Sequence, residues 1–464
     1  MDNRDAIFHL ASNVVNTTYQ DLPREVIEIT KKSILDTVGV ILAASGIGEG
    51  CQQIVELVKE DGGREESSIL GFGGKVPACA AAFANGAMSH AVDYDDVIDL
   101  GDYHATAPTL PAAIAITERV GGISGKEFIT AAALGVDVMG RLALGAKMPT
   151  KVERPNWHPS PVLGAFGSAA GAGKLLGLDT SKMVDAFGHA LHQASGTRQI
   201  GSSPGSPMRG LCNAFGARAG VLSATLAQRG ITGTKDSLES KYGFFNVYFN
   251  GDYDRDALVE DLGKRFEGIN ISFKAWPCAR HTHPFVDATL SIVREHDVRP
   301  DDVVEIVASY GKLSQGFSQP LEALKKPKSM MDAKLSSPFT IAVAAAKRRA
   351  ILCDFTEEGR NDTKTLELAD KVVPRLDPQL LEGPVMLGVV KIRTRTGAVF
   401  SKRVEHPYGH PANPIPMQDL VEKFRDCASY SAKPLPKENI DKAIDLVTNL
   451  EEVADARTVI QLLS

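Results

Sequence analysis

The segment from His90 to His104 combines two histidines with five aspartates in a region otherwise rich in alanine and glycine. His90 and Asp93 are three residues apart, so on a continuing helix they would share a face. A carboxylate beside an imidazole fixes its tautomer and raises its basicity, as proton transfer requires. The EF-hand calcium loop is excluded, because Val97 and Ile98 occupy its fifth position and its glycine position, counted from Asp93. An acidic turn exposed to solvent is the alternative.

A further histidine, His158, directly precedes a glycine-rich segment with a helical pattern over 162–177. Ser160 is a candidate N-cap for that helix, which would place His158 near the positive end of the helix dipole. Such an end attracts anions and opposes protonation of an imidazole. The alternative is a histidine near a helix end with no chemical role. Close helix packing explains the glycines better than a phosphate loop does.

The loop from Gly201 to Arg209 is rich in glycine, serine and proline. It lacks the GxxxxGK[ST] pattern, so nucleotide phosphate binding is not expected. Arg209 could still bind a carboxylate through two parallel hydrogen bonds. A simple connecting loop is the alternative.

A cluster of cationic residues follows a predicted domain boundary, where ligand sites are common. Lys274, Arg280, His281 and His283 lie within ten residues, with Cys278 among them. Zinc is disfavoured, because the spacing fits no standard finger and no second Cys/His pair completes four ligands. The cluster could bind carboxylates, or it could form structural salt bridges.

Together these four segments supply histidines, fixed positive charges and an acid, and they carry no metal or cofactor signature. Such a set can remove a proton next to a carboxylate while cations hold the anion. The GxSxG nucleophile elbow is absent, and no serine or cysteine has the local context of a nucleophile.

The elements that must position these residues are mainly helices. Helical patterns are predicted over 77–90, 109–120, 125–145, 162–177, 181–195, 211–229, 255–265, 283–296 and 338–349, and again from about 416 to the C-terminus. A short strand is expected at 67–70, and strands at 302–309, 389–394 and 399–405 cluster in one stretch. This clustering argues against Rossmann and TIM-barrel folds. We predict a mainly α fold, in which an all-helical domain (1–270 plus 410–464) carries an inserted α+β lid domain (271–409).

Composition limits the class of protein. The chain has 464 residues, 43% hydrophobic and 23% charged, which suits a folded protein of about two to three domains. The net charge is −6, so there is no general basic surface for nucleic acid. No apolar run approaches the roughly 20 residues of a membrane span, and the N-terminus lacks a signal-peptide pattern. Six scattered cysteines without a CxxC pair point to reduced thiols and a cytoplasmic location.

These segments resemble the MmgE/PrpD family across nearly the whole chain. The residues that carry the resemblance are 33–39 (SILDTVG), 84–96 (ANGAMSHAVDYDD), 104–112, 158–167 (HPSPVLGAFG), 274–283 (KAWPCARHTH) with Asp287, and 333–336 (AKLS). The resemblance implies a homodimer without a required cofactor or metal, and an active site between a helical domain and a lid domain. It also implies that Asp93, His104, His158 and His283 occupy active-site positions, with Lys274 in the same motif.

Two residues depart from the family pattern. Arg209 stands where the family usually has lysine, and Val97 where the decarboxylases of the family have threonine. Arginine binds carboxylates well but does not donate a proton at neutral pH. Both changes favour a relative of different specificity.

We therefore predict an enzyme that abstracts a proton α to a carboxylate of a small di- or tricarboxylate. His104 and His158 would be the acid/base pair, Asp93 would tune an imidazole, and Arg209, His283 and Lys274 would bind carboxylates. A dehydratase resembling 2-methylcitrate dehydratase is the main prediction. The alternatives are an iminodisuccinate-like epimerase, a cis-aconitate-type decarboxylase and, outside this chemistry, a non-catalytic carboxylate-binding protein or a metal-dependent hydrolase.

Overall fold

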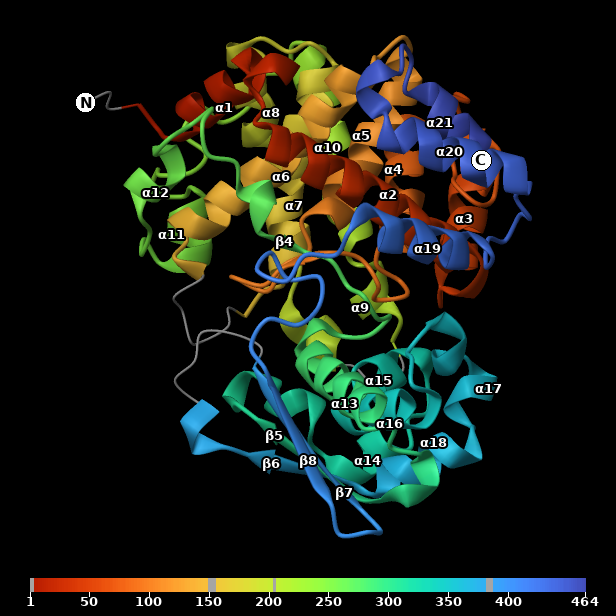
Figure 1. The fold of residues 1–464 in the computed structure, drawn as a ribbon. Coiled ribbons are helices and arrows are strands. Elements are labelled where there is room, and N and C mark those ends of the chain that lie inside the picture. Colours follow the sequence, from red (N-terminus) through yellow and green to blue (C-terminus); the bar gives the residue numbers. More distant parts are fainter. Residues whose placement is uncertain (1–3, 149–155, 203–205, 381–386) are drawn as a thin grey trace. The chain divides into compact units, whose positions relative to one another are not determined.

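A computed structural model describes residues 4–148, 156–202, 206–380 and 387–464 of the chain. The chain divides into two compact units (Figure 1). Unit 1 comprises Met1–Ile271 and Pro416–Ser464, and unit 2 comprises Ser272–Ile415. The predicted boundaries were 270/271 and 409/410. The prediction of a mainly helical fold is confirmed.

The centre of unit 1 is a set of closely packed helices. They are α4 (Ala78–Met88), α5 (Thr106–Val120), α6 (Gly125–Gly145), α7 (Pro159–Leu175), α8 (Thr180–Leu191) and α10 (Asn213–Gln228). Helix α7 packs on α5, α6 and α10. A Cβ added to Gly220 of α10 would lie 2.2 Å from the Ser168 Cβ of α7, and one on Gly167 would lie 2.5 Å from the Gly135 oxygen of α6. The glycines thus allow close helix contact, and α7 is firmly seated.

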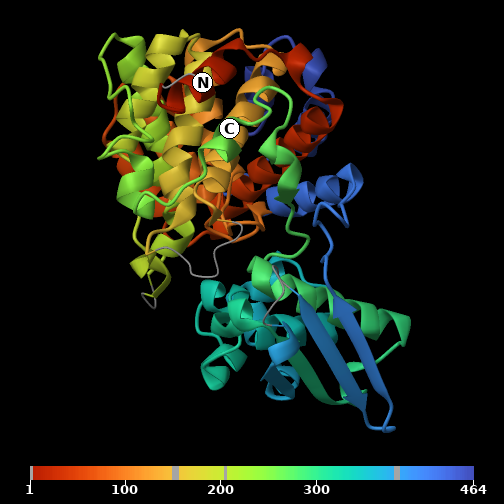
Figure 2. The same ribbon diagram turned by 90° about the vertical axis from the view of Figure 1, so that its left-hand side faces the viewer.

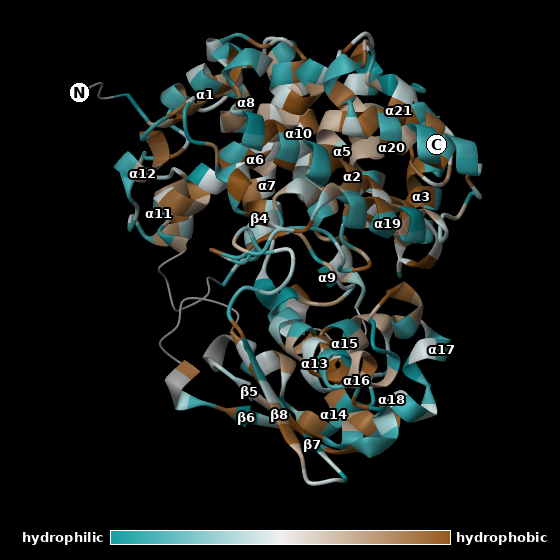
Figure 3. Cartoon of the chain, in the orientation of Figure 1, coloured by the Kyte–Doolittle hydropathy of each residue, from teal (hydrophilic) through white to brown (hydrophobic). Residues whose placement is uncertain are grey.

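Outer helices complete unit 1. They are α1 (Ile7–Asn16), α2 (Arg24–Ile47), α3 (Cys51–Glu60), α9 (Met208–Leu211), α11 (Phe244–Phe249), α12 (Arg255–Val259), α19 (Met417–Ala428), α20 (Lys437–Thr448) and α21 (Arg457–Leu462). Those at the surface, such as α1 and α21, carry both hydrophilic and hydrophobic residues (Figure 3), as expected for helices with one buried face. After the chain returns from unit 2, α19 packs against α2.

Unit 1 also contains very short strands, so it is not purely helical. β1 (Ser67–Ser68) pairs antiparallel with β2 (Lys75–Val76), and β3 (Val97–Ile98) follows α4. The strand β4 (Ile271–Ser272) lies where the chain leaves the unit.

Helix α6 is long and apolar enough to cross a membrane by composition alone. In the folded chain, 94% of its most hydrophobic window is buried inside the protein. Its apolar character therefore reflects a central position in the core of unit 1. The bent pair α2 and α3 passes the same test only if it is counted as one span, and these helices meet at 90°.

Unit 2 is built around a four-stranded sheet with the order β6-β5-β7-β8. Its strands are β5 (Val303–Tyr310), β6 (Val372–Leu376), β7 (Gly388–Thr394) and β8 (Val399–Val404). β5 runs parallel to β6 and antiparallel to β7, and β7 and β8 form the predicted hairpin. Helices α13 (His283–Glu295) and α16 (Ser337–Lys347) cover one face of the sheet (Figures 1 and 2), with Phe285, Ile306, Ile341 and Val390 in the shared core.

The sequence did not predict β6, which contains Pro374. Proline cannot donate a ladder hydrogen bond, so it weakens a strand pattern and is tolerated at a sheet edge. β6 is an edge strand. The remaining helices of unit 2 are α14 (Leu321–Lys325), α15 (Met330–Lys334), α17 (Glu357–Arg360) and α18 (Thr363–Asp370).

Candidate active site

The histidine- and aspartate-rich segment forms a folded loop between α4 and α5. Helix α4 ends at Met88, and Asp93 adopts a left-handed backbone conformation with φ of 48°. Aspartate tolerates this conformation better than most residues. His90 and Asp93 therefore do not share a helix face as predicted, because the helix has already ended. The turn brings Asp95 to His90 instead.

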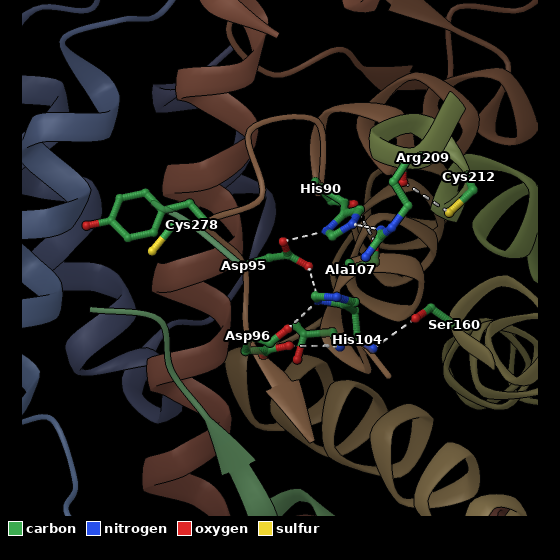
Figure 4. Close-up of polar contacts among 12 residues, drawn as sticks. His90, Asp95, Asp96, His104, Ala107, Ser160, Arg209, Cys212 and Cys278 are labelled. Carbon is green, nitrogen blue, oxygen red and sulfur yellow. Dashed lines mark hydrogen bonds and ion pairs between the residues drawn. The ribbon is translucent and has the colours of Figure 1, made fainter. Parts of the chain in front are cut away.

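Asp95 joins two imidazoles in the interior of unit 1 (Figure 4). Its Oδ1 lies 2.7 Å from His90 Nδ1, and its Oδ2 lies 2.9 Å from His104 Nδ1. The rings of His90 and His104 have centroids 4.2 Å apart. Asp95 is completely buried, and burial by itself raises the pKa of its carboxyl. The two imidazoles outweigh this effect and hold the pKa well below its usual range, so Asp95 is ionised.

The acceptors around each ring fix its tautomer. An ionised carboxylate can only accept hydrogen bonds, so His90 Nδ1 carries the hydrogen that it donates to Asp95 Oδ1. His104 Nδ1 carries a hydrogen because its hydrogen bond of 2.8 Å goes to the backbone oxygen of Asp96, and Asp95 Oδ2 contacts the same nitrogen at ion-pair distance. Nε2 is consequently the atom of the His104 ring that can exchange a proton with a substrate.

Arg209 approaches the opposite side of His90. It belongs to the short helix α9, which follows the predicted loop; residues 203–205 of that loop lie outside the described residues. The Arg209 guanidinium donates from Nη1 to His90 Nε2. Burial, together with the charges of His104 and Arg209, lowers the pKa of His90 to about 4, although Asp95 opposes the shift. His90 is therefore neutral at pH 7, and its Nε2 accepts from a cation.

His158 lies at the start of α7. It is itself the N-cap residue, whereas Ser160, the predicted cap, is inside the first turn because the helix begins at Pro159. The Ser160 hydroxyl accepts a hydrogen bond of 2.9 Å from the backbone N–H of His104, which ties the loop to α7. Burial is the main cause that lowers the pKa of His158 well below its usual value, and the charges of Arg209 and of the other two imidazoles add to it. The charges of Arg209 and His104 thus reach His158, and the predicted roles of these residues in one site stay a prediction.

A buried lysine supports the loop from behind. Lys423 of α19 lies 2.6 Å from Asp36 Oδ1 of α2 and donates a 2.7 Å hydrogen bond to the backbone oxygen of Tyr94. Its ammonium also lies 3.7 Å from the centroid of the Tyr94 ring. The residue directly before Asp95 is therefore fixed by a charged group on a distant helix.

Asp96 differs from Asp95 in its charge state. It is fully buried, and its Oδ1 accepts a weak hydrogen bond of 3.4 Å from the backbone N–H of Thr106. Burial raises the pKa of its carboxyl to about 7, and the nearby carboxylates Asp36 and Asp95 act in the same direction. Two consecutive aspartates therefore hold opposite protonation states over the acidic pH range.

Among the described residues, His90, Asp95 and His104 form the group whose ligand atoms lie close enough to hold a metal ion, all within 4.8 Å of one another. The arrangement does not suit a cation. His90 Nδ1 already donates to Asp95, His104 Nδ1 donates to the Asp96 backbone oxygen, and the guanidinium of Arg209 contacts His90. A metal ion would break both hydrogen bonds and would lie next to a fixed positive charge.

The cationic cluster belongs to unit 2. Lys274, Arg280 and His283 are buried, and His283 begins α13. Its Nε2 lies 3.3 Å from the Cys278 oxygen, its Nδ1 lies 3.4 Å from Arg280 Nη1, and its ring packs against Trp276 with centroids 5.1 Å apart.

The possible zinc ligands of unit 2 do not come together in the described part of the chain. Cys278 Sγ accepts from the Thr282 hydroxyl, and His281 stacks on Phe317. The predicted role of Lys274 and His283 in carboxylate binding stays a prediction.

Two family models together match most of the chain. The family model for the MmgE/PrpD N-terminal domain matches residues 8–256, and that for the MmgE/PrpD C-terminal domain matches residues 276–450. The chain belongs to the MmgE/PrpD family. Cis-aconitate decarboxylase of Homo sapiens is 29% identical over 399 residues, which are 84% of this chain and 80% of that protein.

Fungal members of the MmgE/PrpD family match along almost their whole length. Cis-aconitate decarboxylase of Aspergillus terreus is 26% identical over 99% of this chain and 95% of its own. The cis-aconitate decarboxylase-like protein oryM of Aspergillus oryzae is 24% identical over 96% of this chain and 94% of that protein. The predicted family and the predicted lyase class are thereby confirmed.

The contact of Asp95 with both imidazoles was not predicted from the sequence. The prediction gave Asp93 the task of tuning an imidazole, but the carboxylate in contact with both rings is Asp95. Both aspartates were visible in the same segment, and the helix end at Met88 decides between them. A functional role for Asp93 stays a prediction.

The raised pKa of Asp96 predicts a pH-dependent contribution to stability. Between about pH 4 and pH 7 the folded chain holds a proton on Asp96 that the unfolded chain has lost. This contribution is therefore complete at low pH and is lost as the pH rises through 7. In Asp96→Asn the amide keeps an acceptor for Thr106 but does not titrate. We expect its free energy of unfolding, relative to wild type, to improve by about 2 kcal/mol between pH 5 and pH 8.

Chemical denaturation at each pH measures this difference. The lowered pKa values of His90 and His158 act in the opposite direction, since these groups favour folding as the pH rises, but they are common to both proteins and cancel. Parallel pH profiles for the two proteins would show that Asp96 does not titrate in this range.

Proposed function

We propose that this protein is a cofactor-independent carboxy-lyase that acts on cis-aconitate or a closely similar tricarboxylate. The observation that carries the proposal is the Asp95–His104 pair beside Arg209, which offers a proton-transfer atom next to a carboxylate-binding cation. The relatives support decarboxylation, an alternative in the sequence-based prediction, better than the dehydration that was predicted first.

Decarboxylation of such a substrate needs an acid rather than a base. In cis-aconitate the double bond is β,γ to the carboxylate of the CH₂ group. When the bond between this CH₂ carbon and its carboxylate breaks and CO₂ leaves, the electron pair forms a new double bond to the CH₂ carbon. The electron pair of the old double bond then takes a proton at the alkene CH carbon. The products are CO₂ and a dicarboxylate with a terminal methylene, and one proton is consumed in each turnover.

His104 is the proposed donor of this proton. Asp95 stabilises the imidazolium and keeps the ring oriented, so that Nε2 gives its proton to the substrate carbon. A proton from solvent later restores the imidazolium. Arg209 holds a substrate carboxylate, a task suited to its planar guanidinium and permanent charge. His158 is neutral in the free protein, and an arriving polyanion would favour its protonated form. Lys274 and His283 are proposed to bind further carboxylates.

Dehydration of a 2-methylcitrate-like substrate is the second candidate. The observation that favours it is the position of His104 Nδ1 against two acceptor oxygens, which leaves Nε2 as the ring atom that can act as a base. It would remove a proton α to a carboxylate, and the electron pair would expel hydroxide, which takes a proton from a second group to leave as water. His104 would therefore accept a proton from the substrate in dehydration, whereas it would donate a proton to the substrate in decarboxylation.

NMR in D₂O distinguishes the candidate reactions. We expect purified protein, without added metal, to convert cis-aconitate into CO₂ and a methylene dicarboxylate that carries one deuterium. Parallel samples contain citrate, 2-methylcitrate and iminodisuccinate. Formation of an alkene from 2-methylcitrate would establish the dehydratase, and deuterium exchange at a stereocentre without an alkene would establish an epimerase. If all four substrates remained unchanged, the proposed chemistry would be wrong.

The two proposed proton-transfer residues can be tested separately. We expect His104→Ala and His158→Ala each to lower kcat about 10²- to 10⁴-fold, which is the usual contribution of a positioned acid or base. Exposed His192→Ala is the matched control and should keep wild-type turnover. Circular dichroism checks that the variants fold. Near-normal turnover in both active-site variants would remove these residues from the mechanism.

We also propose that the protein is a homodimer, as the family resemblance implies. On unit 1, Phe215 of α10 is 45% exposed and packs edge-on against Phe83 of α4, with ring centroids 5.4 Å apart. The Arg218 guanidinium lies above the same Phe83 ring. Aromatic residues and arginine are enriched in protein interfaces, so this face is the proposed contact.

Analytical ultracentrifugation tests the contact. We expect a dimer for wild type and a shift towards monomer for Phe215→Asp, because the substitution would place a charge in an apolar interface. Tyr242→Asp, at another exposed aromatic position, should remain dimeric. A wild-type monomer, or a Phe215→Asp protein that stays dimeric, would contradict the assignment.

A further inference from the structure

The two charged groups nearest to the imidazole pair, Asp95 and Arg209, do not contact each other directly. Within the described residues Arg209 forms no ion pair, although arginine and carboxylate usually associate through two strong hydrogen bonds. The ring of His90 lies between them (Figure 4). Its Nδ1 is 2.7 Å from Asp95 Oδ1, and its Nε2 receives the Arg209 Nη1 hydrogen bond.

We infer that His90 is a positioning residue that separates Arg209 from Asp95 and so keeps the guanidinium available as a receptor for a substrate carboxylate. The inference rests on the proposed function, since it names the element that holds one carboxylate of the substrate. It adds a role for a residue that the proposed reaction does not itself use.

The hydrogen-bond polarity of His90 supports this role. Asp95 accepts, so His90 Nδ1 must donate, and Arg209 donates, so His90 Nε2 must accept. Only a neutral imidazole satisfies both partners at once. A neutral partner leaves the positive charge of Arg209 uncompensated, which a carboxylate partner would not do.

The separation also protects His104. Asp95 uses its two oxygens for the two imidazoles, Oδ1 for His90 and Oδ2 for His104. Without the His90 ring, the Arg209 guanidinium could approach Asp95 and form a bidentate pair with both oxygens. That pairing would weaken the contact of Asp95 with His104 and fill the carboxylate receptor at the same time.

Asparagine and glutamine can each replace one half of the histidine. The Asn amide lies close to the position of Nδ1, so His90→Asn keeps a donor for Asp95 and loses the acceptor for Arg209. The longer Gln amide reaches the position of Nε2, so His90→Gln keeps an acceptor for Arg209 and loses the donor for Asp95. The pair therefore separates the two functions of the ring.

Calorimetric binding of propane-1,2,3-tricarboxylate, which has no double bond to react, reports on the receptor. We expect His90→Asn to weaken binding at least tenfold, as Arg209→Ala does, and His90→Gln to weaken it less than threefold. In turnover the order reverses, with kcat falling further in His90→Gln because His104 loses its oriented carboxylate. His192→Asn, an exposed histidine of unit 1, is the control. Equal effects of the two His90 variants on binding would overturn the inference.

Nitrogen-15 NMR of the imidazoles in wild-type protein tests the inference without any ligand or variant. We expect His90 to be neutral with its hydrogen on Nδ1 throughout pH 5–9. The titratable and charged groups that face its ring are Asp95, His104 and Arg209. A protonated ring, or a hydrogen on Nε2, would overturn the inference. If the tricarboxylate did not bind to wild type at millimolar concentration, the proposed function would fail, while the NMR result would still decide the arrangement of His90.

Discussion

The site depends on one buried carboxylate. Asp95 is completely removed from solvent, and an ionised carboxylate in that position is tolerated only when hydrogen bonds replace its water. The His90 Nδ1–H group supplies one to Oδ1, and the His104 ring lies 2.9 Å from Oδ2. Because the carboxylate accepts and does not donate, it sets the tautomer of His90, and the backbone oxygen of Asp96 beside it sets that of His104. The contact of His90 with Arg209 follows from this one constraint.

The surrounding backbone holds that carboxylate in place. The loop leaves α4 through the left-handed turn at Asp93, so its geometry is set by local conformation as well as by contacts. Three attachments fix its other parts: Ser160 accepts from the backbone of His104, Thr106 donates to Asp96, and Lys423 holds the Tyr94 carbonyl. Glycine-mediated packing seats α7, which carries Ser160, against its neighbours. The helical scaffold thus positions a loop that would have little structure alone.

Much of this arrangement was visible in the sequence. Hydrophobic periodicity predicted α6 over 125–145, the same residues that the structure gives, and the strand alternation predicted the β7–β8 hairpin. The sequence motifs also predicted a shared site for His104, His158 and Arg209, and this stays a prediction. The sequence could not show that Asp95 contacts both rings. That contact depends on where α4 ends and on the turn that follows, and a helix boundary is uncertain by a few residues in any periodicity argument. The proton held by Asp96 depends on depth of burial, which no local pattern reveals.

The ion pair of Lys423 with Asp36 joins two parts of the chain that are far apart in sequence. Lys423 follows the whole of unit 2, yet it holds the carbonyl of Tyr94, 329 residues earlier. During synthesis, the ribosome therefore releases the aspartate loop long before the cation that secures it has been made. The nascent N-terminal part can form its helices, but Asp36 has no Lys423 to neutralise it and the loop lacks one of its attachments. A truncated product that ends before α19 therefore lacks the Lys423 contacts that fix the loop, and the site is fully supported only when the chain extends through α19.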